Sequence, residues 1–78
     1  MSKKEKIEDK IKDLNATRAM FHRDFERFEK QYKDKDISKE EFKKHKINYE
    51  KKREKIRIKI HALEGKLEQL RKNSQMIK

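Results

Sequence analysis

The basic side chains of this chain are concentrated in one stretch of the sequence. Residues 43–59 carry nine Lys and Arg opposed only by Glu50 and Glu54. They therefore hold seven of the ten net positive charges of the 78-residue sequence. Lys and Arg at this density attract a polyanion, and they contact its phosphates mostly without reading bases.

A second stretch, residues 14–23, contains no acidic side chain and three small ones. Small side chains let another backbone approach closely, either a partner helix or a sugar-phosphate chain. Arginine can hold a phosphate through two hydrogen bonds or insert into a minor groove, and Asn and Thr can bond to sugar or phosphate oxygens. The residues predicted to bind nucleic acid are Asn15, Thr17, Arg18, Arg23, Lys51, Lys52, Arg53, Lys55, Arg57 and Lys59.

Two heptad patterns must position these side chains, and they predict helices over residues 2–33 and 38–75. The first pattern contains Ile7, Ile11, Leu14, Phe21, Phe25, Phe28 and Tyr32. The second contains Phe42, Tyr49, Ile56, Ile60, Leu63, Leu67, Leu70 and Ile77. At this spacing the aromatic residues of the first pattern are interpreted as core, the alternative being a platform on which bases stack.

Residues 34–37 form the predicted turn between the helices. Ser38 is a favourable N-cap, and Glu41 stands three residues later, which is the spacing of a capping box. Ile37 and Phe42 flank the cap as a hydrophobic staple. A turn this short makes the helices antiparallel neighbours.

An antiparallel hairpin closed at this turn pairs seam residues whose numbers sum to about 74. Tyr32 then meets Phe42, and Phe25 meets Tyr49, so apolar residues match apolar residues. Arg18 falls level with Ile56 near the middle of the rod. Unpaired burial of a charge is costly, so we expect such seam arginines to extend their heads into water or onto an anion.

A second, weaker stripe on the second helix faces away from the seam and contains Ile47, Glu54, Ile58, Ala62 and Gly65. Two helices alone leave their apolar edges open, so we expect self-association into a dimeric or tetrameric bundle. Two copies of the basic patch would bridge two duplexes if they faced opposite ways, or lengthen one site if they faced the same way. The sequence does not choose between these arrangements.

Several kinds of chemistry have no basis in this sequence. It has no Cys, a single Gly and no Pro, so thiolate sites and Gly-rich phosphate loops are excluded. His22, His45 and His61 lack the spacing of metal ligands, and His22 with Glu26 is interpreted as a surface pair. We expect no catalytic residues, no metal, no cofactor, no small-molecule substrate and no membrane association. The expected location is cytoplasmic, at the nucleoid.

Two resemblances follow from particular residues. The segment Asp36-Ile37-Ser38-Lys39-Glu40-Glu41-Phe42 resembles the turn and helix start of short oligomerisation (SHOCT-type) modules, although it lacks the Gly those modules carry before the Ile. The run Lys51-Lys52-Arg53-Glu54-Lys55-Ile56-Arg57-Ile58-Lys59, with the +10 charge and the absence of Cys, resembles small basic nucleoid proteins of archaea. That resemblance implies coating or bridging of DNA without strong sequence preference.

The sequence thus predicts one all-α domain, a two-helix antiparallel coiled-coil hairpin that oligomerises and binds double-stranded DNA non-specifically. Two alternatives remain open at this point. One is a coiled-coil adaptor that binds an acidic protein, and the other is an RNA- or ribosome-associated protein, which would prefer A-form or single-stranded RNA.

Overall fold

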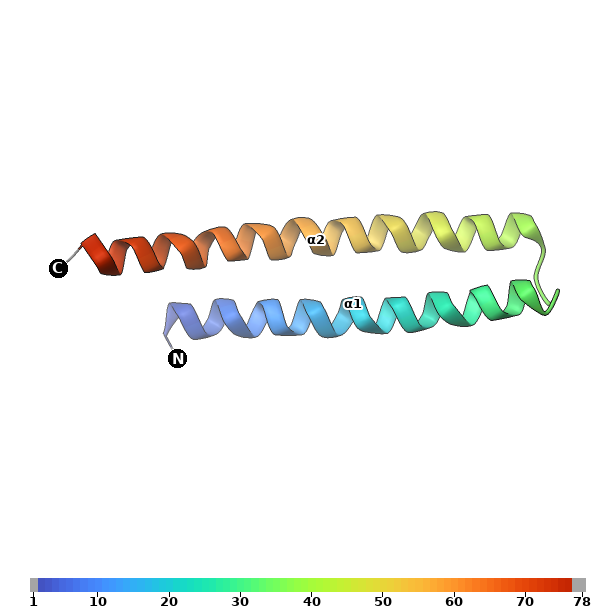
Figure 1. Cartoon of the computed structure of the whole chain (residues 1–78), viewed down its shortest axis with the longest axis horizontal. Helices are drawn as coiled ribbons and strands as arrows, with labels where there is room; N and C mark the ends of the chain where they lie inside the picture. Colours follow the sequence, from blue (N-terminus) through green and yellow to red (C-terminus); the bar gives the residue numbers. More distant parts are fainter. Residues whose placement is uncertain (1, 77–78) are drawn as a thin grey trace.

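The computed structural model describes residues 2–76, and the side chains of residues 2–73. Helix α1 spans Lys3–Lys33 and helix α2 spans Lys39–Met76, and they lie side by side in opposite directions (Figure 1). The rod measures 62 × 18 × 13 Å. The predicted all-α hairpin is confirmed, with each predicted helix boundary within one residue. The predicted seam residue Ile77 lies outside the described residues.

Both helices begin at a serine. The Oγ of Ser2 accepts a hydrogen bond from the N–H of Glu5, and the Oγ of Ser38 accepts one from the N–H of Glu41, each at 3.1 Å. These bonds satisfy backbone donors that lack a partner in the first turn. Within the described residues no return bond runs from the Ser38 N–H to the Glu41 carboxylate, so only half of the predicted capping box forms.

The chain reverses through a left-handed residue. Lys35 has a φ of 63°, and its N–H donates to the carbonyl of Tyr32 at 3.1 Å. The N–H of Asp36 donates to the carbonyl of Gln31 at 2.8 Å. These bonds satisfy carbonyls at the end of α1 and turn the chain toward α2.

Aromatic rings join the helices near the turn. Tyr32 stacks on Phe42 with ring centres 4.7 Å apart, and Phe25 stacks on Tyr49 at 4.6 Å. The predicted register is thereby confirmed. Phe28 also stacks on His45 at 3.6 Å. The rings therefore pack against one another across the seam and remain half-buried.

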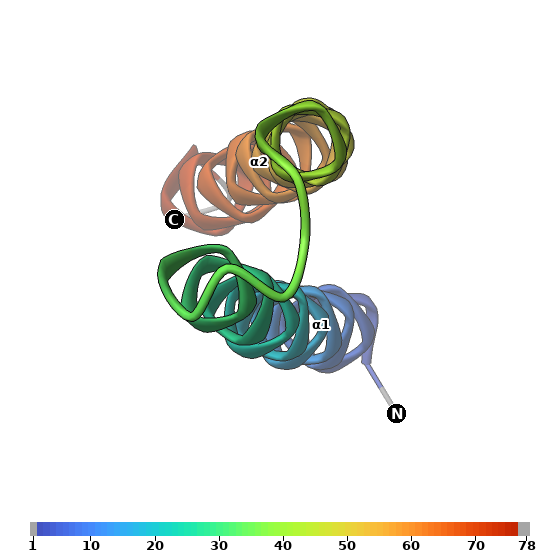
Figure 2. The ribbon, with the colours of Figure 1, turned by 90° about the vertical axis from the view of Figure 1, so that its right-hand side faces the viewer.

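The far half of the seam is aliphatic and forms a thin core. Only Ile56 and Ile60 are buried among the described residues, at 6% and 7% exposure. Each helix has a single neighbouring helix, as the end-on view shows (Figure 2). The weaker stripe predicted on α2 lies away from the seam at its two isoleucines, since Ile47 and Ile58 remain 52% and 55% exposed.

Candidate nucleic-acid interface

Four of the predicted nucleic-acid-binding residues come together in one groove between the helices. We call this surface the arginine groove. It is lined by Asn15, Arg18, Ala19, His22, Tyr49, Arg53 and Arg57. Three arginines and no acidic residue line it.

Helix periodicity and register build this groove. Asn15, Arg18 and His22 follow steps of three and four on α1, so they share one face of that helix. Arg53 and Arg57 are one turn apart on the facing edge of α2. The register places Arg18 level with Ile56, between the two arginines of α2. Charges 35 or more residues apart in the chain therefore meet.

Two of the three arginines have no carboxylate partner within the described part of the chain. Arg18 donates from Nη2 to the Oδ1 of Asn15 at 2.8 Å, and both side chains are exposed. The guanidinium of Arg53 lies 5.9 Å from the ring centre of Tyr49. A guanidinium has five N–H donors in a planar fork, so most of the donors of Arg18 stay available to an anion. The expected exposure of the seam arginines is confirmed.

Arg57 is in a different state because it forms an ion pair with Glu54. Its Nε donates to the Oε2 of Glu54 at 3.0 Å, and its Nη2 donates to the other carboxylate oxygen. The hydrogen bond from Arg57 lowers the pKa of Glu54, and the same bond raises the pKa of Arg57. Glu54 does not line the groove, but it offsets part of the charge of Arg57.

His22 and Tyr49 tie the helices together at the rim of the groove. The Nδ1 of His22 and the hydroxyl of Tyr49 are 3.0 Å apart, and the Nε2 of His22 lies 2.7 Å from the Oε1 of Glu26. The predicted surface pair of His22 and Glu26 is confirmed. Sequence reasoning treated Tyr49 only as a seam residue. The signal was its place in the register. Tyr49 lies opposite Phe25, and His22 is one helical turn before Phe25 on α1.

Three of the four predicted lysines lie on the opposite edge of the rod. Lys52 and Lys59 each line a separate groove there. We call the side that carries Lys52, Lys55 and Lys59 the lysine edge, because Lys55 is three residues after the first and four before the third. The ammonium of Lys52 lies 4.9 Å from the ring centre of Phe21.

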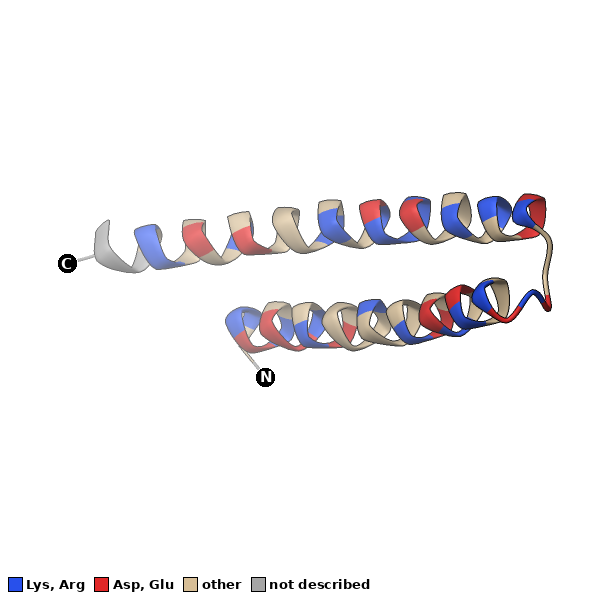
Figure 3. Ribbon diagram, turned by 45° about the vertical axis from the view of Figure 1, so that its right-hand side comes forward, with Lys and Arg blue, Asp and Glu red and all other residues tan. Residues whose placement is uncertain are grey.

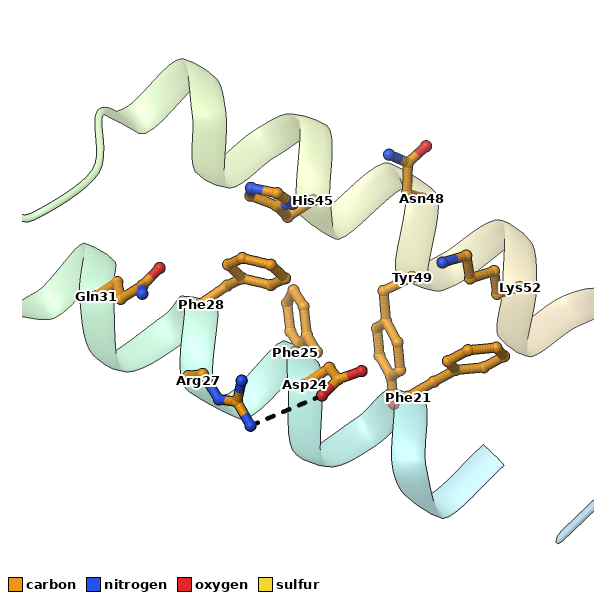
Figure 4. Close-up of a pocket in the computed structure, with 10 residues that line it drawn as sticks. All are labelled: Phe21, Asp24, Phe25, Arg27, Phe28, Gln31, His45, Asn48, Tyr49 and Lys52. Atoms are coloured by element: carbon orange, nitrogen blue, oxygen red, sulfur yellow. Dashed lines mark ion pairs between the residues drawn. The ribbon is translucent and has the colours of Figure 1, made fainter. Parts of the chain in front are cut away.

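Acidic residues of α1 stand along this lysine edge. Asp24 lines the groove that contains Lys52 (Figure 4), and Asp13 lines the groove that contains Lys59. Asp24 also lies 4.0 Å from a guanidinium nitrogen of Arg27, the pair drawn dashed in Figure 4. The lysines therefore share their grooves with negative charge, whereas the arginine groove contains none.

The remaining predicted residues line neither the arginine groove nor the two grooves of the lysine edge. The hydroxyl of Thr17 donates to the carbonyl of Asp13 at 3.0 Å, so its donor is used inside α1. Arg23 follows Arg18 by five residues, which turns it by roughly 140° around the helix. Lys51 precedes Arg53 by two residues and is turned by roughly 160°. The single patch that the sequence suggests is thus divided among several sides of the rod.

Positive charge is concentrated on the half of α2 nearest the turn, whereas α1 carries charges of both signs (Figure 3).

None of the described helices contains an apolar stretch long enough to cross a membrane. The described residues also contain no group of three or more potential metal-binding side chains. In comparisons with protein-family models, curated proteins and solved structures, nothing matches this chain.

Proposed function

We propose that this protein binds double-stranded DNA without sequence preference, through phosphates held in the arginine groove, and so coats or compacts DNA. The observation that carries the proposal is a groove with three arginines from both helices and no acidic lining residue. Arginine suits this role because its planar fork matches the oxygens of a phosphate.

The hydrogen bond between Arg18 and Asn15 supports a pre-arranged phosphate site. The Oδ1 of Asn15 accepts from Arg18, which leaves the amide N–H groups of Asn15 to donate to a sugar or phosphate oxygen. Holding a guanidinium in place before binding lowers the entropy cost of ordering it afterwards. A phosphate between Arg18 and Arg53 would then meet donors from both helices.

The aromatic core favours a duplex over a single strand. Non-specific binding of single strands depends on aromatic faces on which bases stack. Here Phe25, Phe28 and Tyr32 stack on residues of α2. Stacking between the helices occupies at least one face of each of these rings, which favours contact with the backbone of the nucleic acid over stacking on unpaired bases.

The test is a titration of the protein with random-sequence duplex DNA at about 50 and about 200 mM salt, competed by duplex RNA and by poly-glutamate. We expect micromolar or tighter affinity whose logarithm falls linearly with the logarithm of the salt concentration, with duplex DNA the best competitor. A preference for duplex RNA would identify an A-form helix, rather than duplex DNA, as the partner. Preference for poly-glutamate, or no binding at low salt, would overturn the proposal in favour of an acidic protein partner.

A further inference from the structure

The outer face of α2 carries a second stripe that α1 does not cover. It consists of Ile47, Lys51, Glu54 and Ile58, spaced by four, three and four residues, so the four share one side of the helix. The two isoleucines are more than half exposed, and the side chain of Glu54 is 55% exposed. We call these four residues the outer stripe.

The chain has a large surface for its size. A compact monomer of 9.7 kDa would expose about 5,100 Å² by the usual scaling of area with mass. The hairpin exposes 6963 Å², because it is a rod with two buried residues in its described part. The excess of each chain is therefore larger than the roughly 800 Å² that each partner of a standard protein–protein interface buries.

The order of charges in the outer stripe is complementary to itself when the stripe is reversed. A second copy of this chain therefore fits the stripe. In an antiparallel pairing centred between residues 52 and 53, Ile47 faces Ile58 of the partner subunit, and Lys51 faces Glu54 of the partner subunit. Each contact occurs twice because of the two-fold symmetry. A parallel pairing would instead set lysine against lysine and glutamate against glutamate, which is unfavourable.

We propose that two copies of this protein form an antiparallel dimer through the outer stripes of their α2 helices. Glu54 can take part although it already accepts two hydrogen bonds from Arg57. An ionised carboxylate has about four lone-pair sites, so it has room for a further donor from a lysine. The paired isoleucines exclude water from around these charges.

The dimer has a consequence for DNA binding that rests on the proposed function. The two-fold axis lies in the interface and runs perpendicular to α2. Rotation about this axis therefore keeps the arginine-groove side of both hairpins on the same side of the dimer. Both arginine grooves then lie on one face, and their arginines are near the axis because its centre is beside Arg53. The dimer would lengthen one DNA site rather than bridge two duplexes.

The first test measures mass by sedimentation across a concentration series without DNA, so its failure is distinguishable from failure of the DNA proposal. We expect a dimer for the unaltered chain, and a Kd raised at least about tenfold by Lys51→Glu or by Glu54→Lys alone, the equivalent of about 1.4 kcal/mol. An equimolar mixture of the two variants should dimerise again, because each copy supplies the charge that the other lacks. Helical circular dichroism confirms folding of each variant.

A matched control comes from Met20 on α1, a large apolar side chain of the described part that is also exposed, at 50%. Ile47→Gln with Ile58→Gln should abolish the dimer, whereas Met20→Gln should leave its Kd unchanged. Monomeric mass throughout, failure of the mixed charge variants to associate, or equal damage by Met20→Gln would each overturn the proposal.

The direction of pairing is tested by disulfide formation, since the chain has no cysteine of its own. A disulfide requires Cα atoms within about 7 Å. Antiparallel pairing predicts that Ile47→Cys protein links to Ile58→Cys protein when the two are mixed and oxidised. Cross-links formed mainly within each variant alone would show a parallel pair and overturn the arrangement.

Discussion

The two edges of the rod carry similar numbers of basic side chains but differ in what faces them. In the arginine groove, Arg18 comes from α1 and meets Arg53 and Arg57 of α2, and no acidic side chain lines the space. On the lysine edge, Lys52 and Lys59 both come from α2. There α1 contributes one aspartate to each groove, Asp24 and Asp13, together with one basic residue each, Arg27 and Lys10. In our proposal, the acidic residues on the helix across the seam determine which basic residues are available to a phosphate.

This difference shows that a count of charges along one helix does not locate a binding site. In our account the lysine-rich run of α2 would attract a polyanion over a distance of about 8–10 Å at moderate salt and so steer it toward the rod. Tight contact needs donors that converge without a competing carboxylate. In our account the arginine groove makes the contact and the lysine edge supplies long-range attraction.

The largest effect is expected from reversing charge in the arginine groove. Arg18→Glu together with Arg53→Glu should abolish measurable binding. Two guanidinium groups that donate hydrogen bonds to phosphate are replaced by two carboxylates that repel it. Fluorescence anisotropy with labelled duplex DNA measures the loss. The matched control is Lys52→Glu with Lys59→Glu, which makes the same change in net charge. The account predicts residual binding there, and an equal or greater loss from the lysine pair would contradict it.

A smaller effect is expected from adding a single acid to the arginine groove. Ala19 lines the groove with a small side chain and is exposed, so glutamate fits there without disturbing the core. Ala19→Glu should weaken DNA binding about tenfold, as one ion pair near a protein surface is worth on the order of 1–4 kcal/mol before screening. Ala16→Glu on α1, outside the groove, is the control. Equal weakening by both would mean that only net charge matters.

Removing the acids from the lysine edge should make the two edges more alike. Asp13→Asn with Asp24→Asn should raise affinity for DNA a few-fold and steepen its dependence on salt, because Lys52 and Lys59 would lose their negative neighbours. Titration at several salt concentrations measures both quantities. No change in the affinity or in its salt dependence would show that these aspartates do not weaken the interaction of the lysines with DNA.

The smallest effect is expected at the rim of the arginine groove. Tyr49→Phe keeps the aromatic stack on Phe25 but removes the hydroxyl that lies 3.0 Å from His22. We expect a loss of about 0.5–1.5 kcal/mol in the free energy of unfolding, measured by urea denaturation, with little change in DNA affinity. A large loss of affinity without loss of stability would mean that the hydroxyl contacts DNA itself.

Much of the fold could be predicted because each determinant is local or periodic. Ser38 caps α2 as expected, and the seam spacing gives the register that pairs Phe25 with Tyr49. The meeting of Arg18 with Arg53 follows from the same register. The return bond of the capping box does not form, which the sequence gives no means of seeing.

The extent of the candidate site was harder to predict. Summing charge over residues 51–59 ignores the position of each residue around the helix, so the sequence prediction groups Lys51 and Lys52 with Arg53 although the three point in different directions. Thr17 was expected to bond to nucleic acid, but helix geometry places its hydroxyl within reach of the Asp13 carbonyl. The acids opposite the lysines become visible only when both helices are placed together.

The most direct test of the central claim is the salt dependence of DNA affinity for two matched triple variants. One carries Gln at Arg18, Arg53 and Arg57, and the other carries Gln at Lys52, Lys55 and Lys59, so each loses three charges. The slope of log affinity against log salt reports about 0.9 per phosphate contacted. We predict that the arginine variant loses about 2 to 3 units of slope and the lysine variant less than 1. Equal slopes for the two variants would contradict the account.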